Sequence, residues 1–363
     1  MKKALFITTI GLVKESGGVR YSKSILEAMS GDYDVSLLVL SDVQLFGSRF
    51  LRLFFSILFG LFRLLPPNVI FHSGALSRIP REFRSAHWDL VVIDHLEAAV
   101  AREIFSSKMQ IYIAHNIESE LIAYKLSKIP RFFREIYRKW VMRFEIGLVK
   151  SVDGVVTISS AEASWFRKFC GNVATIYPVF NVNVLSGSLS VTSGRKLRLG
   201  FLGEAGWRPN REAVDILVDE ILPLVSREVD VVFAGSGWGD SQIQKSMRDR
   251  QPRCANFEFP GYIPDIKDYW SSIDVFVAPI VSGAGVNVKI CEALSNGVFV
   301  VALPHAVRGL NDRILECGGV VVVGTKEAFA GAIDNVALEN CEFNPPVEFS
   351  LGYAVSEWKR LTQ

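Results

Sequence analysis

The chain has 363 residues, 49% of them hydrophobic, and its formal net charge of +2 is close to neutral. A length of this order favours two domains rather than one, and the hydrophobic content allows each domain to bury a core. A near-neutral chain gives no overall electrostatic reason to bind nucleic acid, so we expect no nucleic-acid partner.

The cysteines and the apolar runs narrow the class of protein further. Cys170, Cys254, Cys291, Cys317 and Cys341 form no CxxC pair, and no spacing of His and Cys is typical of a metal site. This pattern indicates free thiols in a reducing compartment and predicts a cytoplasmic protein without a bound metal. No apolar run reaches the ~18 residues that a membrane-spanning helix needs.

The first half of the chain alternates between apolar strand patterns and helical patterns. Residues 3–8 come first, and although a basic start before an apolar run resembles a secretory signal, this run is too short and lacks a cleavage site. A buried strand is the better interpretation. A helix is predicted at 19–29, and further strands are predicted at 35–40, 90–93, 111–114 and 154–158. Such alternation is typical of a parallel sheet with crossover helices.

A polar segment and a second alternating series follow. Residues 181–196 are rich in Ser, Gly and Thr, which indicates a linker. Strands are then predicted at 197–202, 229–234, 257–259, 275–278 and 298–302, with helical patterns at 209–225 and 355–361. The predicted fold class is α/β, with two doubly wound Rossmann-like domains, 1–180 and 197–347, facing a central cleft. The helical segment within 348–363 is expected to pack back on the first domain.

The strongest chemical signal is the segment 282–297, which reads SGAGVNVKICEALSNG and follows a predicted strand. A glycine-rich turn containing Gly283 and Gly285 leads into a helix, and the free N–H groups at such a helix start form an anion site. Lys289 and Glu292 are three residues apart and share a helix face. A cation beside the anion site suits a diphosphate, and a carboxylate one turn deeper suits ribose hydroxyls. The alternative is a surface ion pair on an ordinary helix.

This segment resembles the donor-binding helix of family-4 glycosyltransferases, and further pieces of the second half resemble that family in order and spacing. These are GEAGWRPN at 203–210, VFAGSG at 232–237, FPGYI at 259–263, YWSSIDVFVAP at 269–279 and Gly309-Leu310. The resemblance implies the GT-B fold and a C-terminal nucleotide-sugar-binding domain.

The resemblance also implies roles for residues in this domain. Glu292 would bind the ribose, and Lys289 and the N–H groups near Gly285 would hold the diphosphate. Tyr262 and Ile263 would line the base, and the alternative for Tyr262 is a packed aromatic residue of a loop. The remaining donor-site positions are the glycines and the start of the helix: Gly203, Gly235, Gly283, Val286 and Asn287.

The first half resembles the family more loosely. Gly17 and Gly18 open the first predicted helix, where family members bring backbone close to the donor phosphate and the acceptor. The GxGxxG spacing of a dinucleotide site is absent. His115 follows the strand at 111–114 and resembles the family's histidine at a strand end, which would contact a donor-sugar hydroxyl and act in catalysis with Lys289 and Glu292. A structural hydrogen bond is the alternative role, and Asp94-His95 at another strand end is a second candidate.

The chain departs from the family at three places. Ala284 stands eight positions before Glu292, where many members carry a first glutamate, so the segment resembles a subgroup with a Gly-x-Gly loop followed by Lys-x-x-Glu. Many members have Arg after the glycine that corresponds to Gly203, but this chain has Glu204 there. Asn210 stands near the position of a family Lys. With these two cations missing, Arg208 or Arg211 would assist Lys289 in holding the phosphate. The family's Pro-Asn-Gly element before the linker is replaced by residues 178–181, PVFN.

The expected function is that of a retaining, metal-independent hexosyltransferase that uses a UDP-sugar or GDP-sugar and no cofactor. The sequence gives no acidic DxD-type cluster that suggests a diphosphate bound through a metal ion. The acceptor would be a glycan or lipid-linked glycan in bacterial surface polysaccharide synthesis, that is, O-antigen, capsule or exopolysaccharide. Two alternatives are a sugar-nucleotide epimerase on the same fold and a non-catalytic binding partner.

Two basic and aromatic stretches suggest peripheral contact with the cytoplasmic face of the inner membrane. Residues 49–65 read RFLRLFFSILFGLFRLL, and residues 131–143 read RFFREIYRKWVMR. The first is too short and too charged to span a bilayer but suits a helix lying in the interface. A core helix and a solvated helix face are the alternatives.

Overall fold

The computed structural model describes residues 1–13, 17–41, 54, 65–70, 72–126, 129–180, 195–283, 285–336 and 343–363. The chain divides into two compact units, an N-terminal domain of Met1–Val179 with Leu351–Gln363 and a C-terminal domain of Phe180–Ser350. Most of the predicted linker 181–196 and nearly all of the predicted interfacial helix 49–65 lie outside the described residues.

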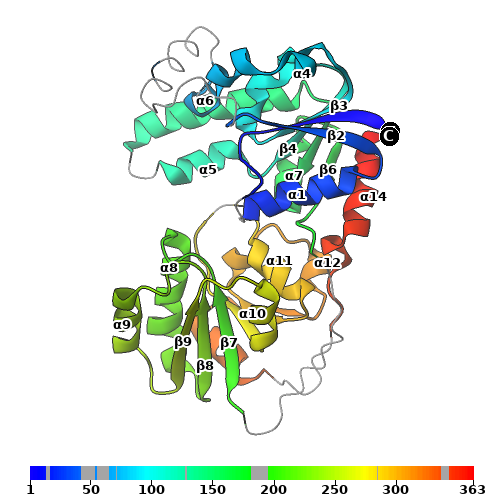
Figure 1. The fold of residues 1–363 in the computed structure, drawn as a ribbon. Coiled ribbons are helices and arrows are strands. Elements are labelled where there is room, and N and C mark those ends of the chain that lie inside the picture. The colour runs from blue at the N-terminus through cyan, green and yellow to red at the C-terminus, as the bar shows by residue number, and fades with distance from the viewer. Residues whose placement is uncertain are drawn as a thin grey trace. The chain divides into compact units, whose positions relative to one another are not determined.

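The N-terminal domain is built on a six-stranded parallel sheet of order β2-β1-β3-β4-β5-β6 (Figure 1). Its strands are β1 (Lys2–Thr8), β2 (Tyr33–Val39), β3 (His87–Asp94), β4 (Ser106–Ala114), β5 (Gly154–Thr157) and β6 (Val173–Thr175). Its helices are α1 (Gly17–Met29), α3 (Pro67–Ile70), η1 (Ser73–Arg78), α4 (Arg81–Ser85), η2 (Leu96–Ile104), α5 (Glu118–Lys125), α6 (Arg131–Val149), α7 (Ser160–Phe166) and α14 (Leu351–Thr362).

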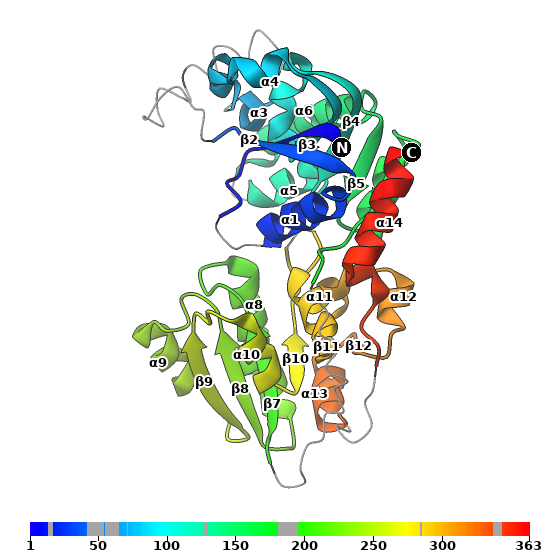
Figure 2. The ribbon, with the colours of Figure 1, turned by 45° about the vertical axis from the view of Figure 1, so that its right-hand side comes forward.

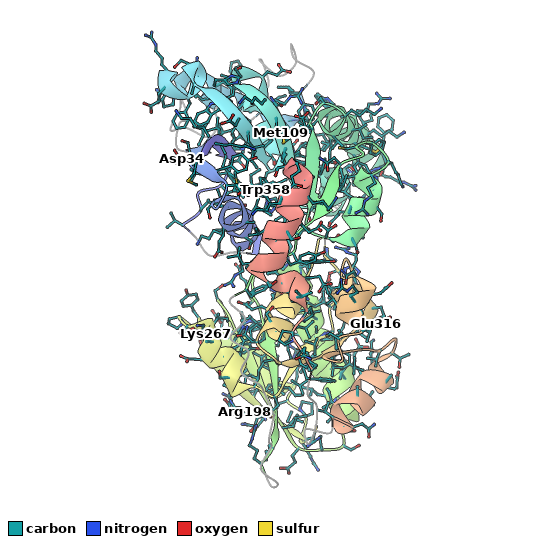
Figure 3. The ribbon with its side chains drawn as sticks, turned by 90° about the vertical axis from the view of Figure 1, so that its right-hand side faces the viewer. Asp34, Met109, Arg198, Lys267, Glu316 and Trp358 are labelled. Carbon is teal, nitrogen blue, oxygen red and sulfur yellow. The ribbon has the colours of Figure 1, made fainter. Side chains whose placement is uncertain are left out.

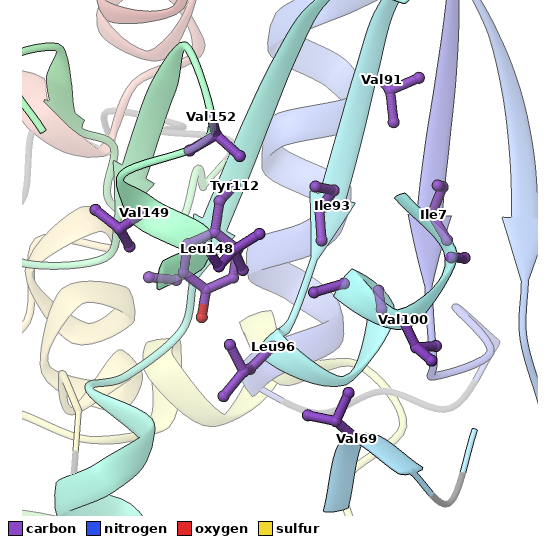
Figure 4. Packing of buried hydrophobic residues seen from close by; sticks show 14 of the residues in the cluster. Ile7, Val69, Val91, Ile93, Leu96, Val100, Tyr112, Leu148, Val149 and Val152 are labelled. Atoms are coloured by element: carbon purple, nitrogen blue, oxygen red, sulfur yellow. The ribbon is translucent and has the colours of Figure 1, made fainter. Parts of the chain in front are cut away.

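Both faces of this sheet are buried, because side chains alternate between the two faces along each strand. On one face Ile7, Ile93 and Tyr112 pack with Leu96 of η2 and Leu148 of α6, as Figure 4 shows. The opposite face is covered by α1 and α14, which also pack against each other. The fully buried Trp358 of α14 (Figure 3) shows that the C-terminal helix belongs to the core of this domain.

The C-terminal domain has a second six-stranded parallel sheet, of order β12-β11-β10-β7-β8-β9 (Figure 2). Its strands are β7 (Leu197–Leu202), β8 (Val229–Ala234), β9 (Ala255–Gly261), β10 (Val275–Ala278), β11 (Phe299–Ala302) and β12 (Val320–Val322). Its helices are α8 (Arg208–Ile216), η3 (Leu217–Ile221), η4 (Leu222–Leu224), α9 (Ser241–Asp249), α10 (Ile266–Ser272), α11 (Val288–Ser295), η5 (Pro304–Val307), α12 (Asp312–Leu315), α13 (Lys326–Asp334) and η6 (Val347–Phe349).

The structure refines several predicted elements. The helix expected at 209–225 is divided into the α-helix α8, a π-helical turn over η3 and a 3₁₀ turn over η4. Pro223 lies in that last turn, and a proline has no N–H group with which to continue an α-helical ladder. The edge strands β6 and β12 were not expected, since three residues are too few to show a periodic pattern.

Candidate functional site

The candidate donor site lies at the carboxyl ends of β7 and β10, which are neighbours at the centre of the C-terminal sheet. From β7 the chain adds β8 and β9 on one side, and it then returns to add β10, β11 and β12 on the other side. The loops after β7 and β10 therefore leave the sheet in opposite directions. Open α/β sheets bind ligands in the crevice that such a switch point creates.

Two glycine turns allow the backbone to pack tightly here. A Cβ atom on Gly203, just after β7, would lie 2.6 Å from Lys289 Nζ and 2.5 Å from Asn210 Nδ2. Gly235, just after β8, has φ +120°, and a Cβ atom there would lie 2.2 Å from the carbonyl oxygen of Gly203. Trp238 Nε1 donates a hydrogen bond of 2.6 Å to that same carbonyl. The backbone of Gly203 thus leaves no room for a side chain at Gly235, whereas at Gly203 itself an added Cβ would meet the ends of two side chains.

The glycine-rich loop after β10 is held from outside by an arginine. Gly283 has φ +121° and Gly285 has φ +71°, so both adopt backbone conformations that favour glycine. Arg308 donates hydrogen bonds to the carbonyls of Gly283 and Gly285 at 3.0 and 2.9 Å. The Ser282 hydroxyl donates to Glu212 on α8. The loop that opens α11 is therefore fixed by side chains from two separate elements.

Helix α11 begins at Val288 with Asn287 at its N-cap, and the Asn287 side chain makes no capping hydrogen bond. The Ile290 N–H donates to the Asn287 carbonyl at 3.0 Å, and the amides before it at a helix start have no carbonyl one turn earlier in the helix to bind. The Asn287 side-chain Nδ2 is buried and has no hydrogen-bond partner in the described residues. A buried N–H without a partner costs free energy, so this group is suited to a ligand oxygen. Glu292, one turn further, is 7% exposed.

Lys289 is the cation of this site. Its Nζ donates a 2.7 Å hydrogen bond to Asn210 Oδ1 and lies 5.7 Å from the centre of the Phe201 ring. Burial lowers the pKa of Lys289 from 10.5 to about 8. Asn210 is a neutral partner, and its Nδ2 donates to the Glu204 carbonyl. The ammonium therefore retains an uncompensated charge, which favours an anionic ligand.

The other predicted donor-site residues occupy different parts of the same domain. Arg208, expected to assist Lys289, forms a salt bridge of 2.6 Å with Glu212. Val286 is buried beside the start of α11. Tyr262 and Ile263 follow β9, two strands from β7, and the Tyr262 side chain is 70% exposed. Gly235 N–H donates to the Gly261 carbonyl at 2.8 Å, which ties this loop to the glycine turns.

In the N-terminal domain, the two histidine candidates are brought together with Asp94. His115 follows β4, and its Nε2 lies 2.7 Å from Asp94 Oδ1 at the end of β3. The rings of His95 and His115 stack with centroids 3.6 Å apart and planes at 16°. His95 has φ +69°, the left-handed region that a non-glycine residue rarely adopts. The sequence indicated His115 and Asp94-His95 as separate candidates, and in the structure these three residues form one cluster.

The electrostatics of this cluster favour an ionised aspartate. Burial alone would raise the pKa of Asp94, but the charges of His95 and His115 and the hydrogen bonds to the carboxylate outweigh it and lower the pKa to about 2. Burial, with a contribution from His115, lowers the pKa of His95 to about 4. Gly18 in the first turn of α1 lies beside the cluster, since a Cβ atom there would be 3.7 Å from His115 Nδ1. Gly17 is the first residue of that helix.

Three residues of these sites were not indicated by sequence patterns. Arg308 acts on loop carbonyls from beyond β11, Trp238 binds the Gly203 carbonyl, and Ser22 donates to Asp94. Arg308 precedes the noted pair Gly309-Leu310, but nothing in the sequence says where its guanidinium lies. Such contacts join elements distant in sequence and require the folded topology.

Comparison with solved structures shows that the fold is GT-B. HepE of Anabaena, solved with UDP and glucose, is 15% identical, with a TM-score of 0.60 over 99% of this chain and 98% of that one. The apo form of WaaB, a lipopolysaccharide outer core galactosyltransferase, is 12% identical, with a TM-score of 0.64 over 99% and 98%. WaaG, a glycosyltransferase involved in lipopolysaccharide biosynthesis, is 14% identical, with a TM-score of 0.54 over 98% and 94%.

The C-terminal domain carries a family match. Residues 196–339 match the family model for glycosyl transferases group 1. This domain is therefore similar to the group 1 glycosyltransferases, and the whole chain has the GT-B fold. No curated protein sequence matches the chain. The predicted GT-B fold is thus confirmed, and the predicted resemblance to this family is supported over residues 196–339.

Proposed function

We propose that the protein transfers a hexose from a nucleoside-diphosphate sugar to a glycan or lipid-linked acceptor, with retention at the anomeric carbon. The observation that carries this proposal is the start of α11, where the unpartnered Asn287 Nδ2 and the cationic Lys289 lie beside the helix N-terminus. Such groups suit a diphosphate. Glu292, one turn deeper on the helix face, is assigned to the ribose by its likeness to the family's donor-binding helix.

In the proposed reaction the sugar–phosphate bond breaks and negative charge develops on the departing diphosphate. Lys289 and the helix start would stabilise that charge without a metal ion. Within the described residues of the C-terminal domain, no three His, Cys, Asp or Glu side chains lie close enough to hold a metal ion. His115 would contact a sugar hydroxyl. Retention itself is inferred from likeness to retaining family members.

UDP is the first nucleotide to test, because HepE has been solved with UDP and with UDP-glucose. We expect UDP at about 100 times its Kd to add ~2.7 kcal/mol of stability, which corresponds to a rise in Tm of ~5 °C. Parallel samples with GDP, ADP and CMP identify the base. Glu292→Ala should remove the rise, and Glu316→Ala, at an exposed position of the same domain (Figure 3), should keep it.

The results of this thermal assay separate the candidate functions. A rise with one nucleoside diphosphate supports the donor site and selects the sugar donors to assay for transfer. NMR of the glycosidic product then shows whether the anomeric configuration is retained. If no nucleotide changes Tm, or if Glu292→Ala responds like the wild type, the proposed donor site is wrong.

We also propose peripheral membrane contact through the N-terminal half of α6, in support of a lipid-linked acceptor and a bacterial surface polysaccharide pathway. Phe132, Phe133 and Ile136 are 70%, 63% and 51% exposed on this helix, and Arg131 and Lys139 beside them are also exposed. Exposed aromatic rings next to cations are typical of helices that lie in a membrane interface. No helix in the described part of the chain is long and apolar enough to cross a bilayer.

Vesicle sedimentation tests this contact. We expect binding to anionic phosphatidylglycerol vesicles that exceeds binding to neutral phosphatidylcholine vesicles and falls with added salt. Phe132→Gln/Phe133→Gln should weaken binding by about 10²-fold or more, since each ring would lose ~1.5–3 kcal/mol of burial in the membrane. Val347→Gln, an equally exposed apolar position in the C-terminal domain, is the control. Equal binding by all three proteins would contradict the assignment to α6.

A further inference from the structure

The His115 ring is held in one orientation by three neighbours. Its Nε2 lies 2.7 Å from Asp94 Oδ1, its face stacks on His95 at 3.6 Å, and the Tyr21 ring meets it edge-on at 5.0 Å and 85°. All three neighbours come from the N-terminal domain, from α1 and from the end of β3. A ring restrained from three directions is preorganised for a contact at its remaining polar atom, Nδ1.

Asp94 determines which nitrogen of this ring carries the proton. The Asp94 side chain is fully buried, and its Oδ2 accepts a 2.9 Å hydrogen bond from the Ser22 hydroxyl. An ionised carboxylate can only accept hydrogen bonds, so His115 Nε2 must donate to Oδ1. In the neutral ring the lone pair then lies on Nδ1. That nitrogen lies beside Gly18, where an added Cβ would be 3.7 Å from it.

We propose that Asp94 is a positioning residue that fixes the Nε2–H tautomer of His115, so that Nδ1 accepts a hydrogen bond from a hydroxyl group of the sugar substrate beside the start of α1. This inference rests on the proposed function for the identity of the substrate, but its structural part does not. It specifies the ligand chemistry: Nδ1 is an acceptor and selects a hydroxyl rather than a carboxylate or phosphate oxygen.

The same three side chains have the chemistry of metal ligands, and their geometry argues against that use. The ligand atoms of Asp94, His95 and His115 lie within 4.8 Å of one another. Imidazole binds a metal through a lone pair in the plane of the ring. Two rings that stack at 3.6 Å with an angle of 16° have planes too far apart to share one ion. The hydrogen-bonded dyad fits the arrangement better.

The tautomer can be read directly by long-range ¹H–¹⁵N NMR of protein labelled with ¹⁵N-histidine. The chain has five histidines, and His115→Gln identifies the signals of His115 by their loss. We expect a protonated Nε2 and an unprotonated Nδ1 in the wild type. This measurement needs no substrate and no Asp94 variant, so it remains decisive even if such a variant folds poorly. A protonated Nδ1 at neutral pH would overturn the proposal.

Asp94→Asn tests the cause. An amide presents an NH₂ donor that a carboxylate lacks, and when this NH₂ lies opposite His115 Nε2 the ring proton must move to Nδ1, so we expect the Nδ1–H tautomer to become populated. Asp89→Asn is the matched control, because Asp89 lies on the same strand with an exposed ion pair to Lys108 and should leave His115 unchanged. An unchanged tautomer in Asp94→Asn would refute the positioning role, as would stoichiometric Zn²⁺ binding that shifts both His95 and His115.

Transfer assays test the functional part once the donor is known. We expect Asp94→Asn to lower kcat by ~10²-fold or more with a smaller change in the KM for donor, and His115→Gln in that background to add little, because coupled residues are not additive. Asp89→Asn should keep wild-type activity. A changed tautomer with unchanged kcat would refute the hydroxyl contact. If the wild-type protein shows the expected tautomer by NMR but binds no nucleotide, the proposed function is refuted and the positioning role of Asp94 is not.

Discussion

Alanine at position 235 should reduce the free energy of unfolding of the C-terminal domain by roughly 3 kcal/mol or more. Gly235 has φ +120°, which is strained for any residue with a side chain, and its added Cβ would lie 2.2 Å from the Gly203 carbonyl oxygen. That obstacle is backbone and cannot rotate away. The same carbonyl accepts from Trp238, so a shift of Gly203 would also disturb this hydrogen bond.

The measurement is urea unfolding of Gly235→Ala followed by tryptophan fluorescence. Gly239→Ala is a close control, since Gly239 is exposed four residues further on and a Cβ atom there would meet nothing within 4 Å. The control should stay within ~0.5 kcal/mol of the wild type. Because Gly203 also adjoins Lys289, any Gly235→Ala protein that remains folded should bind UDP weakly. Equal stability of the two variants would contradict the tight packing of these turns.

The sheet architecture was predictable because its strands are buried on both faces and read as continuous apolar runs. The predicted strands at 197–202, 229–234 and 275–278 coincide with β7, β8 and β10. Such runs signal parallel strands without reference to the rest of the fold. The division of the predicted helix 209–225 into three helical segments was harder to predict from the sequence, since a π turn depends on packing rather than on a local pattern.

The candidate donor site was predictable in its residue types but not in its contacts. The segment 282–297 displays its glycines, its lysine and its glutamate in one stretch, so the helix start could be inferred directly. By contrast, Asn210 and Lys289 are 79 residues apart, and their hydrogen bond follows only from the adjacency of β7 and β10. Likewise, Asp94 and His115 are joined by the pairing of β3 with β4.

The substitution of Asn210 near a family lysine position has a consequence for charge. A second lysine there would repel Lys289, whereas the amide oxygen of Asn210 accepts a hydrogen bond from it. The candidate donor site thus presents the ammonium group of Lys289, whose pKa burial lowers to about 8. If this cation holds the diphosphate as proposed, nucleotide affinity should depend on pH.

The direction of this dependence follows from the two states of Lys289. In the unliganded folded protein the ammonium loses its proton near pH 8, while the unfolded chain keeps it until about the ordinary lysine pKa of 10.5. The unfolded state therefore binds more protons between these values, and the stability of the unliganded protein should rise with pH across that window. Nucleotide affinity should change in the opposite sense. A bound diphosphate favours the charged amine, so the affinity falls as pH rises above about 8.

We expect UDP affinity to fall by up to about tenfold per pH unit above pH 8, and we propose calorimetric titration between about pH 7.5 and 9. Phosphate groups, with a second pKa of ~6, are fully ionised throughout this range. Lys289→Met should bind UDP ~10²-fold more weakly at pH 7.5 and show little further change, because its side chain has no proton to lose.

Lys289→Met also separates binding from stability. Without nucleotide it should unfold at a higher temperature than the wild type at pH 7, since it no longer buries an uncompensated charge. Lys267→Met, at an exposed position of the same domain (Figure 3), should match the wild type in Tm, in UDP affinity and in pH dependence. A wild-type affinity that is constant from pH 7.5 to 9 would show that another group supplies the charge, and Arg211 on α8 would be the next residue to replace.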